Sequence, residues 1–236
     1  MGSRAQNAGQ AAVVDRRMML TGAAALAATV AMTRHSTSSQ TGRFRPRGTG
    51  GTSHAAFDRL LRRYVVPDGR GYNAVDYRRF RAEALPELRA YLDGLQAAVP
   101  SAFSRAEAHA YWINLYNAKT LEIVLDRYPV RSIRDINLGG SGLFGRGPWS
   151  KAVVEVEGTD LSLDDIEHEI VRPIFGDPLS HYGLNCASYS CPNLAGTAYT
   201  GSNVQALLAA GAAAYVNHPR GVAVEDRRIT ASKVYS

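Results

Sequence analysis

Apolar residues recur at helical spacing in the part of the chain that follows residue 53. Residues 54–64 carry them on one face, which predicts an amphipathic helix. A second helix is predicted from Pro86, because proline is well suited to a first helical turn, to about Ala98. The first half of this region is therefore expected to be helical.

The longest predicted helix begins after Ser104. Ser104 and Glu107 have the spacing of a capping box, in which the serine caps the helix and the glutamate reaches back. This helix is expected to run to about Arg127, and Pro129 stops it.

Two shorter helices are predicted later in the chain. One covers residues 163–171, and Arg172 and Pro173 are expected to end it. The other follows Ser202 and ends near Asn217.

Strand patterns cluster toward the end of the chain. Residues 152–156 alternate and are β-branched, residues 182–186 fit a short buried strand, and residues 222–225 and 228–230 fit a hairpin. Helices that lead and strands that follow favour an α+β fold. We expect one domain over residues 53–236, with a helical N-terminal half packed on a small, mostly antiparallel sheet.

The N-terminal segment has the parts of an export signal. Arg16 and Arg17 precede a short, alanine-rich apolar stretch, which resembles a twin-arginine signal. We expect a signal peptide over residues 1–32, with cleavage after Ala31, and a disordered linker over residues 33–52. The alternative is an arginine-containing tail without function. Export predicts the twin-arginine machinery as a partner and a periplasmic or extracellular location, and no apolar run is long enough to span a membrane.

The basic net charge belongs to the leader. Residues 1–50 hold seven arginines and one acidic residue, so they account for the whole net charge of +6. The rest of the chain is neutral, which gives no reason to expect nucleic-acid binding by bulk charge.

Two asparagines interrupt the most apolar part of the long helix. Asn114 and Asn117 are poor interior helix residues, because their amides compete with the backbone. If they are buried, they need partners. Either they bind loop backbone and fix the fold, or one of them is an oxyanion donor or an orienter of a histidine.

A second candidate group lies on the helix predicted after residue 162. Asp165, His168 and Arg172 have spacings that place them on one helical face. A carboxylate beside a histidine orients its ring and raises its pKa, as a general base requires. The alternative is a capped surface helix with acidic residues near its positive end.

The third group contains both cysteines. In the predicted strand, His181 and Asn185 share a face, and Cys186 follows directly. A thiol near a histidine can serve nucleophilic catalysis, but Cys186 and Cys191 could also form a disulfide in an exported protein. Their spacing is not typical of zinc fingers, so we predict no metal site and no cofactor.

Several motifs together resemble one known family. They cover residues 110–118, 128–136, 148–149, 161–168 with 172–173, and 184–188 with 190–192. The chain resembles the bacterial and plant family catalogued as domain of unknown function 547 over roughly residues 55–234. This resemblance implies no settled activity. Similar domains continue past the strand that corresponds to residues 229–234, so we expect this chain to be truncated.

Two main functions remain open at this point, beside a less favoured redox or metal site that would use both cysteines. The first is an exported thiol enzyme for acyl transfer or amide hydrolysis, with Cys186 as nucleophile and His181 or His168 as base. In this enzyme Asp165 or Asn185 would orient the base, and Asn114 or Asn117 would polarise the acyl oxygen. The second is a non-catalytic binding or assembly domain in which the same motifs form a structural polar network. The substrate or protein partner is unknown in both.

Overall fold

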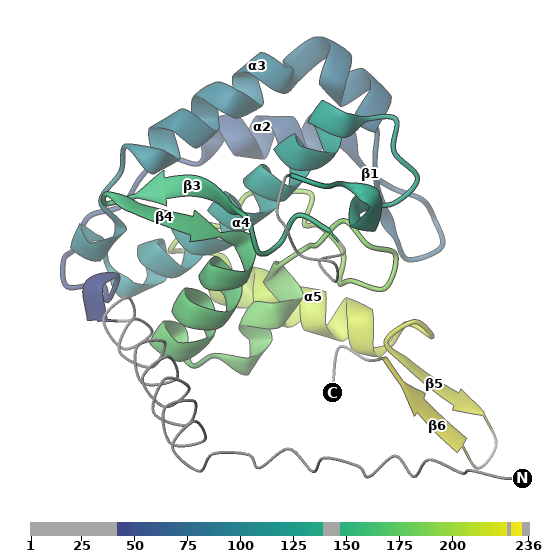
Figure 1. The fold of residues 1–236 in the computed structure, drawn as a ribbon. Helices are drawn as coiled ribbons and strands as arrows, with labels where there is room; N and C mark the ends of the chain where they lie inside the picture. Colours follow the sequence, from purple (N-terminus) through teal and green to yellow (C-terminus); the bar gives the residue numbers. More distant parts are fainter. Residues whose placement is uncertain (1–41, 139–146, 226–227, 233–236) are drawn as a thin grey trace, which may run out of the picture. The chain divides into compact units, whose positions relative to one another are not determined.

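The computed structural model describes residues 42–138, 147–225 and 228–232. The predicted signal peptide and the first part of the predicted linker lie outside these residues. The longer helices are α2 (Ala55–Tyr64), α3 (Tyr77–Gln96), α4 (Arg105–Arg127) and α5 (Val204–Val216). In Figure 1, α2 and α3 lie on one side of α4, and α5 lies on the other.

Helix α4 forms the centre of the core. Ser104 caps it, since its side chain accepts a hydrogen bond from the Glu107 N–H, as the sequence predicted. The second hydrogen bond of a capping box, from the Ser104 N–H to the Glu107 side chain, is not formed, because that N–H donates to the Gly50 carbonyl. Most residues from Ala108 to Leu125 are buried, including both asparagines. An isolated helix with this composition would expose apolar surface on every face, so packing stabilises it.

Helix α3 begins earlier than the sequence predicted. Asp76 caps it by accepting a hydrogen bond from the Arg79 N–H, and Pro86 lies in its interior. A proline there removes one helical hydrogen bond. The buried apolar face, which includes Phe80, Ala84, Leu88 and Leu92, offsets that cost.

Strands occur only as separate antiparallel pairs among the described residues. The pairs are β1 (Val65–Pro67) with β2 (Asn73–Val75), β3 (Ala152–Val156) with β4 (Thr159–Ser162), and β5 (Val222–Glu225) with β6 (Arg228–Ala231). The predicted strand at residues 152–156 and the predicted hairpin are confirmed. The fold is α+β, with a helical N-terminal half and small two-stranded sheets.

The segment after β4 differs most from the sequence prediction. It forms a π-helix, η3 (Asp165–Phe175), which continues through Pro173 and ends where Gly176 adopts a positive φ of 58°. A short 3-10 helix, η4 (Pro178–Gly183), then follows, and the predicted strand at residues 182–186 is absent, since residues 184–186 have no regular secondary structure. Asp177 caps η4 by accepting from the Leu179 N–H, and Pro178 supplies the fixed φ of a first turn.

Part of the predicted linker belongs to the folded domain. Phe44 is fully buried, with its ring edge-on to Trp112 at a centroid distance of 5.1 Å. Gly50 forms an isolated bridge with Phe103 just before α4. The prediction of disorder is therefore wrong for residues 42–52, because one aromatic side chain gives this polar segment a place in the core. No described helix combines the length and apolar character that a membrane span requires.

Two short 3-10 helices complete the elements. One is η1 (Pro100–Ala102), directly before α4, and the other is η2 (Ile133–Asp135), which follows α4. The described residues belong to one compact unit.

Candidate functional site

Both polar atoms of the Asn114 side chain form hydrogen bonds with the backbone of one distant residue. Its Nδ2 donates to the Tyr199 carbonyl at 2.7 Å, and its Oδ1 accepts from the Tyr199 N–H at 3.0 Å. Both residues are buried. Tyr199 lies in a segment without regular secondary structure. Asn114 thus satisfies the N–H and carbonyl groups of Tyr199 in the way that a neighbouring strand would.

Asn117 and Asn185 bind the backbone in the same way. Asn117 Nδ2 donates to the Gly183 carbonyl at 2.8 Å, and its Oδ1 accepts from the Asn185 N–H at 2.8 Å. Asn185 donates to the Pro192 carbonyl and accepts from the N–H of Ala187, which has a positive φ of 54°. Asn114 and Asn117 therefore attach residues 183–199 to α4, and the Asn185 side chain cross-links backbone groups within that segment.

A disulfide closes the centre of this attached segment. Cys186 and Cys191 are bonded to each other, and no free cysteine occurs among the described residues. In this form Cys186 carries no thiol. A cysteine nucleophile therefore exists only if the bond is first reduced.

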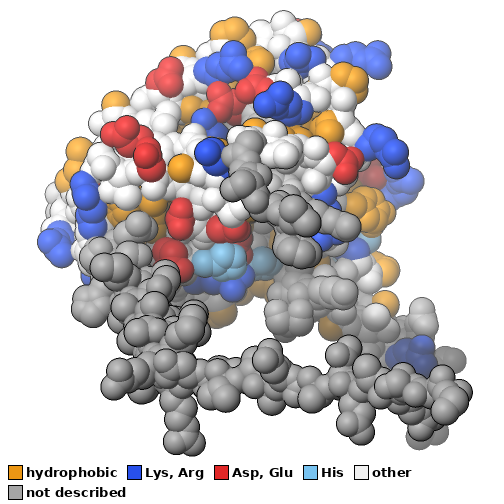
Figure 2. Space-filling model, viewed as in Figure 1, with side chains coloured by type: hydrophobic (Ala, Val, Ile, Leu, Met, Phe, Trp, Pro, Cys, Tyr) orange, Lys and Arg blue, Asp and Glu red, His pale blue; other side chains and the backbone are white. Residues whose placement is uncertain are grey.

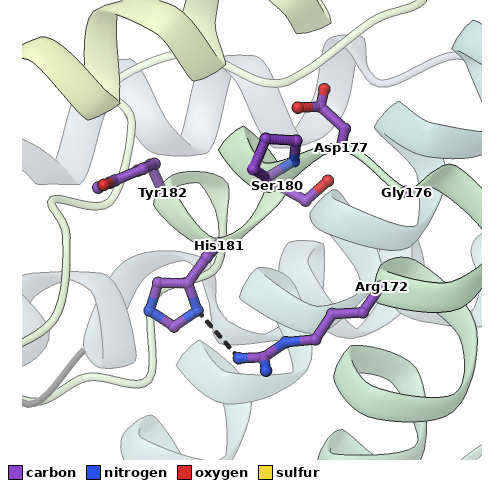
Figure 3. Close-up of a pocket in the computed structure, with 7 residues that line it drawn as sticks. Arg172, Gly176, Asp177, Ser180, His181 and Tyr182 are labelled. Atoms are coloured by element: carbon purple, nitrogen blue, oxygen red, sulfur yellow. Dashed lines mark hydrogen bonds between the residues drawn. The ribbon is translucent and has the colours of Figure 1, made fainter. Parts of the chain in front are cut away.

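His181 lies in a pocket beside a carboxylate that the sequence prediction did not choose. The pocket has a volume of about 440 Å³ and is lined by Arg172, Gly176, Asp177, Pro178, Ser180, His181 and Tyr182. Figure 3 shows the His181 ring pointing toward the Arg172 guanidinium. His181 Nδ1 is 3.3 Å from Glu167 Oε1, which also accepts from Arg172 Nη2 at 2.8 Å.

The electrostatics of this pocket favour an ionised Glu167. Burial raises the pKa of its carboxyl, but the hydrogen bond with His181 and the charges of His168, His181 and Arg172 lower it more, so the net shift is downward. An ionised Glu167 accepts the Nδ1 proton of His181 and leaves Nε2 as the acceptor nitrogen. His181 Nε2 is buried and has no hydrogen-bond partner among the described atoms. Figure 2 shows histidine, acidic and basic side chains gathered on one patch of the molecule.

The predicted group of Asp165, His168 and Arg172 is not formed. Asp165 accepts hydrogen bonds from the N–H and hydroxyl of Ser162, at 2.8 and 2.6 Å, and its own N–H donates to Ser162 Oγ at 3.1 Å, so its carboxylate is engaged at the start of the helical segment. His168 is exposed. Burial raises the pKa of the neighbouring Asp164, and the charge of His168 offsets only part of that rise. Arg172 pairs with Glu167, five residues before it. The wider turn of a π-helix brings residues at this spacing together, whereas the prediction assumed α-helical spacing.

A second histidine pair was missed by sequence reasoning. His109 Nε2 is 2.8 Å from Ser180 Oγ, and both residues are buried. The His109 ring stacks on Phe175 at a centroid distance of 4.4 Å. The sequence pointed to His109 only in that it is a histidine inside the apolar part of the long helix. Nothing in the sequence around Ser180 indicated its role. Because Ser180 is almost fully buried, we interpret this pair as a core contact under the pocket.

Two buried histidines are expected to make the fold sensitive to acid. Burial lowers the pKa of His54 and of His109 to about 4; the Asp177 charge raises and the Arg105 charge lowers that of His109 by smaller amounts. In the unfolded chain their pKa is about 6.5. Their stabilising contribution is therefore fully present above pH 6.5 and is lost as the pH falls toward 4. The loss can reach about 3 kcal/mol per histidine.

The measurement is the free energy of unfolding between pH 7.5 and 4.5. His109→Gln is expected to reduce the pH dependence, because glutamine binds no proton in this range. His168→Gln, at an exposed position, is the matched control and is expected to change the pH dependence less than His109→Gln does. Equal pH dependences for wild type and His109→Gln would contradict this assignment.

No cluster of three metal-binding side chains occurs in the described parts of the chain.

The fold and site together define an α+β domain in which a buried helix and a disulfide-closed segment support a histidine pocket. Residues 100–216 match the family described as "Protein of unknown function, DUF547". The predicted resemblance is thus confirmed over these residues, a narrower range than residues 55–234. No curated protein and no solved structure matches the chain.

Proposed function

We propose that this chain is an exported, non-catalytic binding domain whose asparagine and cysteine motifs build the fold. One observation carries the proposal. The amides of Asn114, Asn117 and Asn185 each donate to and accept from backbone groups, and both cysteines are in one disulfide. The residues that an acyl-transfer enzyme would use are already engaged in holding residues 183–199.

The asparagine geometry argues against an oxyanion role. An oxyanion donor must present an N–H group toward the reacting oxygen. The Nδ2 groups of Asn114 and Asn117 instead donate to carbonyls at 2.7 and 2.8 Å, and both side chains are buried. Turning either amide toward a substrate would leave backbone groups buried without partners, which costs about 1–3 kcal/mol for each group.

The disulfide also supports export as part of the proposal. Disulfides persist in oxidising compartments such as the periplasm and are rare in the cytosol. The twin-arginine pattern at Arg16 and Arg17 gives a route to such a compartment.

A thiol-dependent acyl-transfer or amide-hydrolysing enzyme is the second candidate. The pairing of His181 with Glu167 favours it, because a carboxylate on Nδ1 leaves Nε2 available as a base. This candidate requires reduction of the Cys186–Cys191 bond, which takes up two electrons and two protons and frees the Cys186 thiol. Glu167 then has the orienting role that the sequence assigned to Asp165 or Asn185.

Thiol trapping in cells distinguishes the two candidates. Cells that express the chain are lysed in an alkylating reagent, and Cys186 and Cys191 are mapped by mass spectrometry. We expect neither cysteine to be labelled in wild type and both to be labelled after treatment with a dithiol reductant. The double variant Arg16→Lys, Arg17→Lys is the control for export, and retention in the reducing cytosol should make both of its thiols reactive.

The opposite result would favour the enzyme. If Cys186 of the unreduced wild type is labelled, and the rate follows an apparent pKa well below about 8.5, the thiol is activated and binding alone is not its role. Equal oxidation in wild type and in the double-lysine variant would contradict the proposed route of export.

A further inference from the structure

A second pocket lies against the disulfide-closed segment. It has a volume of about 340 Å³, and its lining includes Tyr72, Tyr189, Cys191, Asn193 and Arg220. These residues come from the β1–β2 connection, from the segment that the asparagines hold, and from the turn after α5. The pocket is distinct from the histidine pocket, because the two share no lining residue.

Arg220 is a cation without an anionic partner in the described parts of the chain. Its guanidinium lies over the rings of Tyr72 and Tyr215, at 4.4 and 5.2 Å from their centroids. It donates to Asn193 Oδ1 at 2.5 Å and to the Tyr189 carbonyl at 3.5 Å, both neutral groups. Its Nε is buried and has no hydrogen-bond partner among the residues that the structure describes.

This arrangement leaves room for an anion. A charge that is partly removed from water is normally paired with an opposite charge, because the lost hydration is otherwise uncompensated. A guanidinium presents donors in a planar fork that matches a carboxylate. The carboxylate of Asp68, which also lines the pocket, is already bound by the N–H groups of Arg70 and Tyr72 and by the Arg70 side chain.

Asp68 also restricts the charge of the anion. A negative charge in the same pocket repels a dianion more than a monoanion. A carboxylate, which carries one charge, therefore fits better than a phosphate monoester.

An aromatic surface adjoins the cation. The rings of Tyr72 and Tyr189 stack at a centroid distance of 4.5 Å, and Tyr189 is 74% exposed. An exposed ring beside a pocket offers a flat apolar face to a ligand. The Cys186–Cys191 bond closes the short segment that carries Tyr189, so the bond fixes the ring near Arg220.

We propose that this pocket binds a small organic carboxylate with a flat face. The carboxylate lies on Arg220, and the flat face lies on the ring of Tyr189. This inference rests on the proposed binding function and specifies its ligand class. An aromatic acid and a sugar acid share this chemistry.

The test is titration of the purified, disulfide-bonded protein with benzoate and with glucuronate, using benzamide and glucose as neutral counterparts. We expect at least one of the two acids to bind and its neutral counterpart not to bind. Added salt should weaken the binding of the acid. Binding of benzoate alone identifies an aromatic acid, and binding of glucuronate alone identifies a sugar acid. Absence of binding by both acids, or equal binding by acid and neutral counterpart, overturns the inference.

Variants locate the site. Arg220→Gln should weaken binding about tenfold or more, and Tyr189→Ala should also weaken it. Arg59→Gln, at a largely exposed arginine that does not line the pocket, is the matched control and should leave binding unchanged. If Arg220→Gln fails to fold, Tyr189→Ala still decides, because its exposed ring contributes little to the core. Unchanged binding in Tyr189→Ala would overturn the inference.

This result is separable from that of the thiol experiment. Unreactive cysteines with no carboxylate binding would remove only this ligand assignment, whereas an activated Cys186 would remove the proposed binding function.

Discussion

Asn114→Ala is expected to destabilise the domain by about 4 kcal/mol, which corresponds to a fall in Tm of roughly 10 °C. The substitution leaves the N–H and the carbonyl of Tyr199 buried without partners, since Asn114 is the residue that binds both. Each orphaned group costs about 1–3 kcal/mol, and the deleted amide leaves a small cavity in addition. Thermal unfolding followed by circular dichroism measures the effect.

The matched control for this prediction is Asn217→Ala. Asn217 is exposed at the end of α5, where its amide donates to the Ala213 carbonyl four residues earlier. We expect a change of about 0.5 kcal/mol or less. A similar small effect for Asn114→Ala would mean that residues 183–199 are held by other contacts, and it would remove the main support for a structural role of the asparagines.

Phe44→Ala is expected to lower the free energy of unfolding by about 3–5 kcal/mol, although the sequence predicts that Phe44 lies in a linker. Its side chain is fully buried and packs edge-on against Trp112 of α4. The free energy of unfolding from a urea titration measures the loss. Arg45→Ala, at an exposed neighbouring position, should change it by less than about 0.5 kcal/mol. Equal values for the two variants would show that residues 42–52 do not contribute to the core.

The sequence predicted the helices and hairpins where local signals agree with the final packing. The helix at residues 54–64, the Ser104 cap and the strand at residues 152–156 each combine periodicity with a clear boundary residue. The errors occurred where tertiary contacts outweigh a local rule. Pro86 and Pro173 both lie inside helices, because the buried faces of these helices compensate for the missing hydrogen bond.

The candidate site was predicted less well than the fold. His181 was identified as a candidate, and the structure places it in a pocket, but its partner is Glu167. The π-helical turn determines this pairing, and residue spacing alone does not reveal such a turn. The predicted strand at residues 182–186 failed for a similar reason. Side-chain amides from α4 satisfy the backbone there, and a sequence pattern does not show which distant side chain will do so.

The burial of most of α4 between Ala108 and Leu125 sets where the domain can be divided. The family resemblance covers residues 100–216, but the helices that cover one side of α4 precede this range. A fragment cut at residue 100 would lack Phe44, α2 and α3, and would expose a broad apolar surface of α4 to water. The recognisable part of the sequence is therefore smaller than the minimal folding unit, and an expression boundary for this domain belongs before residue 42.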